Sequence, residues 1–217
     1  MLKETFKKYW HIVFALYCPI YLAWFFMLES RPDNLGTNIH IPFDDLIPFC
    51  ELFIIPYLLW FAYIAFTVVF FFFYDRGEFI KYATFLIIGM TISLTICTVF
   101  PNYQSMRPDA LADDNIFSAI VLKLYNIDDN ANVLPSVHVL NSIAAHFAIA
   151  KSTFFCNKKI LKAGSFVLMV LICLSTVFLK QHSVLDGLCA FVIAVILYLF
   201  IYSNISIPAM IKLTKNR

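Results

Sequence analysis

His182 and Asp186 lie four residues apart in the segment LKQHSVLDGL. On a helix this spacing puts both side chains on one face, so the carboxylate can accept a hydrogen bond from one ring nitrogen. The other nitrogen is then free to act as a nucleophile or a base. An ionisable pair at the entrance to an apolar segment is costly and favours a functional role. A simple hydrogen bond at a helix end would explain the pair equally well.

His138 begins an apolar segment in NVLPSVHVLNSIAAH, three residues after Pro135. Proline is common in the first turn of a helix, where its missing N–H would have no partner. The free amides of Ser136, Val137 and His138 would then point out of the helix end and, with the helix dipole, form a site for an anion. A single histidine at such a position is more often an interfacial residue, so both interpretations stay open.

Arg107 lies in FPNYQSMRPDALADDN and is the third candidate. Its planar guanidinium suits a phosphate group, and Pro108 restricts the backbone on its C-terminal side. An Arg–Pro pair in a loop carries little information alone, so its meaning depends on what lies near it.

The composition indicates the class of protein whose fold must position these residues. Of 217 residues, 61% are hydrophobic and only 14% are charged, and the mean hydropathy is +0.80. A soluble domain cannot bury so much apolar surface, so the sequence predicts a membrane protein. The net charge of +2 gives no reason to expect nucleic-acid binding. No stretch is long enough for a separate soluble domain, and residues 1–217 are expected to form one transmembrane domain.

Six segments are long and apolar enough to cross the hydrocarbon core as helices. The sequence therefore predicts an all-α fold, an integral membrane six-helix bundle with spans at about 9–28, 52–74, 82–100, 136–155, 163–179 and 187–204. The longest connection, residues 101–135, is rich in Asp and Asn. A connection of that length in a compact domain is often functional.

The basic residues predict the orientation of these spans. Twelve of the sixteen lie at the two chain ends, in the second loop and after the fourth span, whereas the other loops hold only Arg31, Arg107, Lys123 and Lys180. Basic loops face the cytoplasm, so both termini are expected there, in a multi-pass protein of the cell membrane. The first, third and fifth loops would then lie outside, with Arg107, His138 and His182 at one outer surface.

The other polar residues are given plainer interpretations. His146 lies two turns after His138, about 12 Å deeper, and is expected to make an interhelical hydrogen bond. The pairs Asp44–Asp45, Asp113–Asp114 and Asp128–Asp129 are interpreted as solvated loop charge, and the six cysteines as packing residues. Two histidines and Asp186 would also make a metal-ligand set, but Arg107 would be an unfavourable neighbour for a cation.

Together, the three segments resemble a known signature. RP at 107–108, PSVH at 135–138 and the series Ser175, Thr176, His182 and Asp186 are similar to the KxxxxxxRP, PSGH and SRxxxxxHxxxD motifs of the type 2 phosphatidic acid phosphatase and vanadium haloperoxidase superfamily. The order of the motifs, the spacing of the third and the six-span plan all agree. IPFDDLIPFCELFIIPYLLWF and YNIDDNANVLPSVHV look like bacterial members.

This resemblance implies phosphotransfer without a metal or any other cofactor. His182 would attack phosphorus to form a phosphohistidine, with Asp186 orienting it, and His138 would protonate the leaving alcohol. The substrate-phosphate group would include Arg107, Ser136 and Val137, with Ser175 and Lys180 as possible auxiliary residues. Such chemistry needs positioning and positive charge more than covalent machinery.

Three departures from the motifs keep alternatives open. Phe100 and Thr176 stand where the family has a lysine and an arginine, and Val137 replaces the glycine of the second motif. The PSxH form resembles the inositol phosphorylceramide and sphingomyelin synthase branch, which transfers a head group to a lipid alcohol. The first expectation is a membrane lipid-phosphate phosphatase whose partners are a lipid phosphate and the bilayer. Head-group transfer is the second, and a non-catalytic lipid-binding or scaffold protein is the third.

Overall fold

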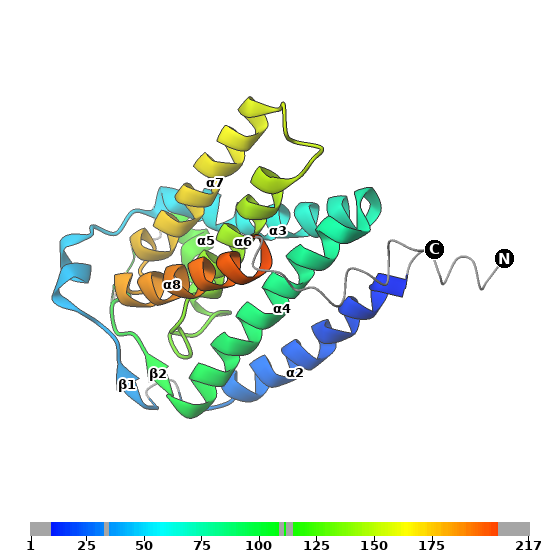
Figure 1. Ribbon diagram of the computed structural model, residues 1–217. Helices are drawn as coiled ribbons and strands as arrows, with labels where there is room; N and C mark the ends of the chain where they lie inside the picture. The colour runs from blue at the N-terminus through cyan, green and yellow to red at the C-terminus, as the bar shows by residue number, and fades with distance from the viewer. Residues whose placement is uncertain (1–9, 33–34, 109–110, 112–114, 204–217) are drawn as a thin grey trace.

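Helices make up most of the protein in a computed structural model that describes residues 10–32, 35–108, 111 and 115–203 (Figure 1). This confirms the expected all-α, membrane-type fold. The α-helices are α2 (Tyr17–Glu29), α3 (Ile54–Tyr74), α4 (Arg76–Val99), α5 (Ile116–Tyr125), α6 (Val137–Lys151), α7 (Lys159–Phe178) and α8 (Val184–Ile201). Three short 3₁₀ helices are labelled η1 (Trp10–Leu16), η2 (Pro42–Leu46) and η3 (Glu51–Phe53). The predicted span limits at 9 and 204, the pair Asp113–Asp114 and the basic residues of both chain ends lie outside the described residues.

Five helical segments in the described part of the chain are long and apolar enough to cross a membrane. They are His11–Glu29, Glu51–Tyr74, Arg76–Val99, Lys159–Phe178 and Val184–Ile201. The predicted fourth span, 136–155, is shorter than expected because α6 ends at Lys151 after 15 residues. At the rise of an α-helix this is about 22 Å, less than the roughly 30 Å of the hydrocarbon core.

The short helix α6 is the centre of the bundle. It packs against α3, α4, α7 and α8, and its middle turns are buried, including Asn141, Ser142, Ala144 and Ala145. Small residues let neighbouring helices approach closely in a membrane protein. Because α6 is surrounded by protein instead of lipid, it does not need to match the full thickness of the apolar layer.

Polar contacts inside the bundle include the predicted one at His146. Its Nδ1 lies 3.1 Å from the Ser165 hydroxyl on α7, and Tyr63 on α3 reaches the same hydroxyl at 2.7 Å. The interhelical role expected for His146 is confirmed. These bonds connect α3, α6 and α7 deep in the bundle.

Three helices start earlier than the sequence predicts. α4, α7 and α8 begin at Arg76, Lys159 and Val184 instead of 82, 163 and 187. Their first turns carry polar residues that an apolar run does not include. Asp75 caps α4 by accepting a hydrogen bond from the Glu78 amide at 2.7 Å, and such caps extend a helix beyond its hydrophobic core.

The first, third and fifth loops lie at one end of the bundle. Arg31 in the first loop donates to the carbonyl of Cys97 near the end of α4 at 3.2 Å. The Cys50 amide, in the same loop, donates to the carbonyl of Phe178 at the end of α7 at 3.1 Å. The expected grouping of these loops is therefore present in the fold.

The long connection after α4 is structured where it is described. Asn102–Tyr103 (β2) pairs in parallel with Thr37–Asn38 (β1) from the first loop. Helix α5, which the sequence analysis did not predict, buries Val121 against Ile54, Tyr57 and Leu179. These contacts fasten the connection to the start of α3 and the end of α7. It is thus held across the end of the bundle where His138 and His182 lie.

Candidate active site

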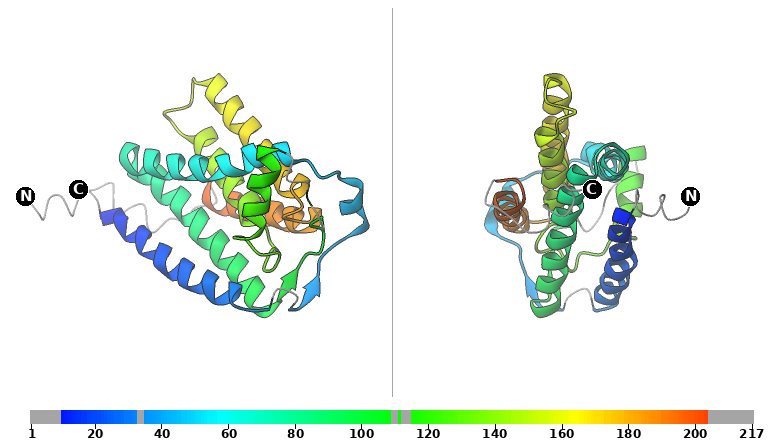
Figure 2. Two further views of the ribbon diagram at one scale, coloured as in Figure 1. Left: turned by 180° about the vertical axis from the view of Figure 1, so that it is seen from behind. Right: turned by 45° about the vertical axis from the view of Figure 1, so that its right-hand side comes forward.

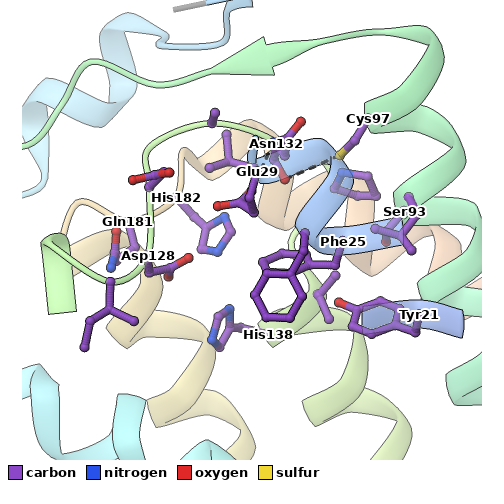
Figure 3. Close-up of a pocket in the computed structure, with 18 of the residues that line it drawn as sticks. Tyr21, Phe25, Glu29, Ser93, Cys97, Asp128, Asn132, His138, Gln181 and His182 are labelled. Atoms are coloured by element: carbon purple, nitrogen blue, oxygen red, sulfur yellow. Dashed lines mark hydrogen bonds between the residues drawn. The ribbon is translucent and has the colours of Figure 1, made fainter. Parts of the chain in front are cut away.

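A pocket of about 350 Å³ opens at this end of the bundle. Its walls come from α2, the first turns of α3, the last turns of α4, residues 124–138 and the turn before α8 (Figure 3). His138 and His182, 44 positions apart in the sequence, both line it. Apolar side chains of α2 and α3 form one side of the pocket, and Leu22, Phe26 and Phe61 are exposed there.

His182 and Asp186 form the hydrogen bond that their spacing predicts. Nδ1 of His182 lies 2.8 Å from Oδ2 of Asp186. Ser183 caps α8 by accepting from the Leu185 amide, and the His182 amide donates to the carbonyl of Thr176. The ring is therefore fixed in a tight turn between α7 and α8, and the backbone of Val133 also contacts it.

The same carboxylate governs the protonation of His182. Burial of the ring opposes protonation, but the Asp186 charge and hydrogen bond outweigh burial and hold the pKa of His182 above its usual value. Asp186 has no exposed surface. A buried carboxylate this close fixes the ring's orientation and stabilises positive charge on it.

His138 faces His182 across the pocket. Their ring centroids are 5.5 Å apart at an angle of 61°. The His138 ring packs against Tyr57 at 4.7 Å and Trp60 at 4.4 Å, both on α3. Two histidines on separate helices thus converge on one space, which fits one of them attacking a substrate and the other exchanging a proton with it.

The start of α6 differs in detail from the predicted anion site. Ser136 is the N-cap, and Pro135 precedes the helix instead of opening it. The Ser136 hydroxyl accepts from the Val139 amide at 3.4 Å, and the Ser136 amide donates to the carbonyl of Asp186 at 3.3 Å. Ser136 is therefore buried and joins α6 to α8, while Val137 lines the pocket.

Arg107 lies beside the pocket, with its guanidinium used by the protein itself. Nη1 donates to the carbonyl of Tyr125 at 3.1 Å, and Nη2 donates to those of Asp128 and Asp129 and to Oε1 of Gln181. The group also lies 4.5 Å over the Tyr125 ring. Arg107 holds the segment that walls the pocket, and its Nε is buried without a hydrogen-bond partner in the described structure.

Lys180 and Ser175, the two predicted auxiliary residues, do not line the pocket. Lys180 donates from Nζ to the carbonyls of Asp44 at 2.7 Å and Ile47 at 2.5 Å, and it does not line the pocket. Ser175 is buried and donates to the carbonyl of Ile172 within α7. Thr176, where the motif has an arginine, donates to the carbonyl of Cys173. In the described structure these three positions bring no positive charge to the two histidines.

Asp44 is a residue that the sequence analysis misjudged, because it is 2% exposed and not a solvated loop charge. Its carboxylate accepts from the Ser183 hydroxyl at 2.7 Å and the Val184 amide at 2.8 Å. Together with the bond from Lys180 to its carbonyl, these contacts clamp both sides of the turn that carries His182. A neighbouring pair of loop acids gave no signal that only one is buried at a helix start.

Replacing Asp44 with alanine should lower the kcat of a reaction at His182 about tenfold to a hundredfold. Asp44 holds the turn that carries His182, and small displacements of a reacting group are costly. KM should change little, since Asp44 does not line the pocket. Asp44→Asn, which retains an acceptor, should recover much of the loss, and the exposed neighbour serves as control in Asp45→Asn. Steady-state kinetics of the variants measure the split. A loss confined to KM or to protein yield would contradict a positioning role.

Asp128 is the second misjudged acid, because it lines the pocket. Its Oδ2 accepts from the Tyr57 hydroxyl at 3.0 Å, and its charge also favours protonation of His182. Among the described residues, no group of three or more His, Cys, Asp or Glu side chains is arranged to hold a metal ion.

The fold and this site define an all-α membrane-type protein in which a histidine–carboxylate pair faces a second histidine. Residues 82–207, more than half of the chain, match the family model of the PAP2 superfamily. The chain therefore belongs to the PAP2 superfamily, whose members are generally phosphatases. The match contains all three motif segments and confirms the resemblance at the level of the family. No curated protein and no solved structure matches the chain.

Proposed function

We propose that this protein is a membrane lipid-phosphate phosphatase that works through a phosphohistidine on His182. The observation that carries the proposal is the His182–Asp186 pair at 2.8 Å, facing His138 across a pocket with an apolar side. Because Nδ1 is held by Asp186, Nε2 is the nitrogen that attacks phosphorus. His138 gives a proton to the leaving lipid alcohol, and water then releases phosphate from His182.

The geometry supports a lipid as the substrate. The exposed apolar residues of α2 and α3 at the pocket lie where acyl chains would be, and the histidines lie at the helix ends, where a polar head group would be. We also propose that both termini are cytoplasmic and the site is on the outer face of the cell membrane. The distribution of basic residues supports this orientation.

Head-group transfer to a lipid alcohol is the second candidate. The same apolar side that would admit a lipid phosphate would admit a lipid alcohol as acceptor in place of water. Val137, the residue that departs from the second motif, lines the pocket next to His138. Both reactions begin with attack of His182 on phosphorus. The phosphatase takes a phosphate monoester and passes phosphate to water, whereas head-group transfer takes a phosphodiester and passes the phosphorylated head group to the lipid alcohol.

A lipid panel tests the proposal. Purified protein is given phosphatidate, an isoprenoid phosphate or a phosphodiester phospholipid that carries a head group, each with and without added diacylglycerol or ceramide, and free phosphate and new phospholipid are both measured. We expect phosphate release that is insensitive to chelators and inhibited by vanadate. New phospholipid in place of phosphate would indicate the transferase. Neither product from any substrate would contradict both enzymes and favour the lipid-binding or scaffold class.

A further inference from the structure

Gln181 places a buried, unused hydrogen-bond donor in the wall of the pocket. The residue is 2% exposed and lines the pocket together with His182. Its Nε2 has no hydrogen-bond partner in the described structure. A buried amide donor without a partner is costly, so this one needs a partner that the described chain does not supply. Figure 3 shows the side chains of Gln181, His182 and His138 around the same pocket.

Arg107 determines which end of this amide faces the pocket. Its Nη2 donates to Oε1 of Gln181 at 2.5 Å. Because a guanidinium has donors and no acceptor, the amide must turn its oxygen toward Arg107 and its nitrogen away from it. Arg107 itself is not among the residues that line the pocket. Gln181 therefore connects the guanidinium to the pocket and presents N–H groups there.

The bond from Arg107 also makes Gln181 a stronger donor. A hydrogen bond to an ionised group is stronger than one between neutral groups, and successive hydrogen bonds polarise one another. An amide whose oxygen accepts from a cation has more positive N–H groups. Part of the positive character of Arg107 is thus passed to the pocket through Gln181.

Gln181 is held against the position at which the third motif has an arginine. The backbone amides of Gln181 and His182 both donate to the carbonyl of Thr176 at 3.0 Å. Thr176 carries no charge, and its hydroxyl donates to a carbonyl within α7. The turn before α8 therefore brings a different donor next to the place of the missing cation.

The turn that carries Gln181 is fixed within the protein. Lys180 has a left-handed backbone conformation, with φ at 51°, which is uncommon outside glycine. Gln104 is fully buried and donates from Nε2 to the Lys180 carbonyl at 2.8 Å, while its Oε1 accepts from the Met106 amide. A donor that is held in place in advance suits the stabilisation of charge that develops in a transition state.

We propose that Gln181 binds a phosphoryl oxygen of the substrate through Nε2 and replaces in part the cations that are absent at Phe100 and Thr176. This rests on the proposed function, in which His182 carries the phosphoryl group. Gln181 directly precedes His182 and lines the same pocket, so its amide is placed to donate to that group. The site then holds phosphate by a directed hydrogen bond that Arg107 strengthens from behind.

The chain allows this contact to be observed directly, because it contains only two glutamines, Gln181 and Gln104. Protein labelled with ¹⁵N in glutamine gives one set of side-chain amide signals from each, and Gln181→Met assigns them. Orthovanadate, a phosphate analogue, is titrated into the full-length protein in detergent. We expect the Gln181 amide protons to shift downfield as the hydrogen bond forms. Gln104 is the internal control, since both ends of its amide are bonded within the protein, and it should move much less.

Two substitutions measure how much the donor contributes. Gln181→Glu keeps the oxygen that accepts from Arg107 and removes the donor, whereas Gln181→Met removes both without adding charge. Vanadate affinity from isothermal titration should fall about tenfold or more in each. The kcat for a lipid phosphate should fall about 10² to 10³-fold, as loss of one oxyanion donor does in other enzymes. Asn157→Asp makes the same amide-to-acid change at an exposed site between α6 and α7 and should alter neither quantity.

The outcomes separate the role of Gln181 from the proposed function. An unmoved Gln181 signal while vanadate binds, or affinity within threefold of the parent protein in both variants, would overturn this role and leave the phosphatase standing. Vanadate binding that depends on Gln181, in a protein that releases phosphate from no lipid, would refute the phosphatase and leave the anion site standing. A parent protein that binds no vanadate would also contradict the inference.

Discussion

Replacing His182 with alanine is expected to lower turnover by on the order of 10³-fold or more, as removal of a covalent nucleophile does in other enzymes. The substitution removes the nitrogen proposed to attack phosphorus and leaves Asp186 buried without its partner. Lipid binding should persist, because the walls formed by α2 and α3 are unchanged. Steady-state hydrolysis and equilibrium binding on the same preparation separate these two effects.

Trapping of the intermediate gives the sharper measurement for His182. Protein quenched during turnover of labelled lipid phosphate should carry an acid-labile, base-stable label, and His182→Ala should carry none. His40→Gln, in the exposed pair with Asp45, is the matched histidine control. Full labelling of the alanine variant would contradict the mechanism.

The pH profile provides a second readout of the same prediction. In the proposed mechanism, attack requires neutral His182, whose pKa is held above its usual value because Asp186 outweighs burial. Activity should therefore fall as the pH drops through that raised pKa, and the acidic limb should lie above the value for a free imidazole.

Replacing His138 with asparagine should lower turnover of lipid phosphates by about 10² to 10⁴-fold, the usual contribution of a general acid. The loss should depend on the leaving group. A lipid alkoxide needs a proton as it departs, whereas nitrophenolate does not, so nitrophenyl phosphate should lose less than about tenfold. Comparing kcat for the two substrates in both proteins measures this dependence.

Asparagine is chosen because His138 packs against Tyr57 and Trp60. Alanine would leave a cavity there, and its effect on folding would mix with its effect on catalysis. Thermal unfolding of the variant in detergent is the accompanying control. An equal loss with both leaving groups would assign His138 to binding or structure instead of proton donation.

The sequence alone identified the parts of the site that depend on local spacing. His182 and Asp186 are four residues apart, and their hydrogen bond forms although His182 lies in the turn just before α8. The five long apolar helices were predictable because crossing a membrane requires a run of apolar residues. Because successive helices run in opposite directions, His138 and His182 lie at the same end of the bundle.

Contacts between distant loops could not be predicted in this way. Asp44 and Asp45 are adjacent residues of the same type, so the sequence does not distinguish them. Only the fold determines that Asp44 reaches Ser183, 139 positions away. Arg107 is the predicted phosphate ligand, and its hydrogen bonds to the carbonyls of residues 125–129 could not be predicted because they form only once α5 is in place. The shortness of α6 was likewise hidden, because it depends on protein instead of lipid surrounding that helix.

The place of α2 affects where the two products of a lipid-phosphate reaction would go. This helix lies at one side of the molecule beside α4 (Figures 1 and 2), and its exposed Leu22 and Phe26 border the pocket. On the opposite side, the Asp44 and Lys180 contacts close the turn of His182. The lipid alcohol would diffuse laterally into the leaflet from which the substrate came, and the small ionic product would leave toward water. Such an enzyme would sort its products by solubility as it makes them, without carrying a hydrocarbon chain through an aqueous phase.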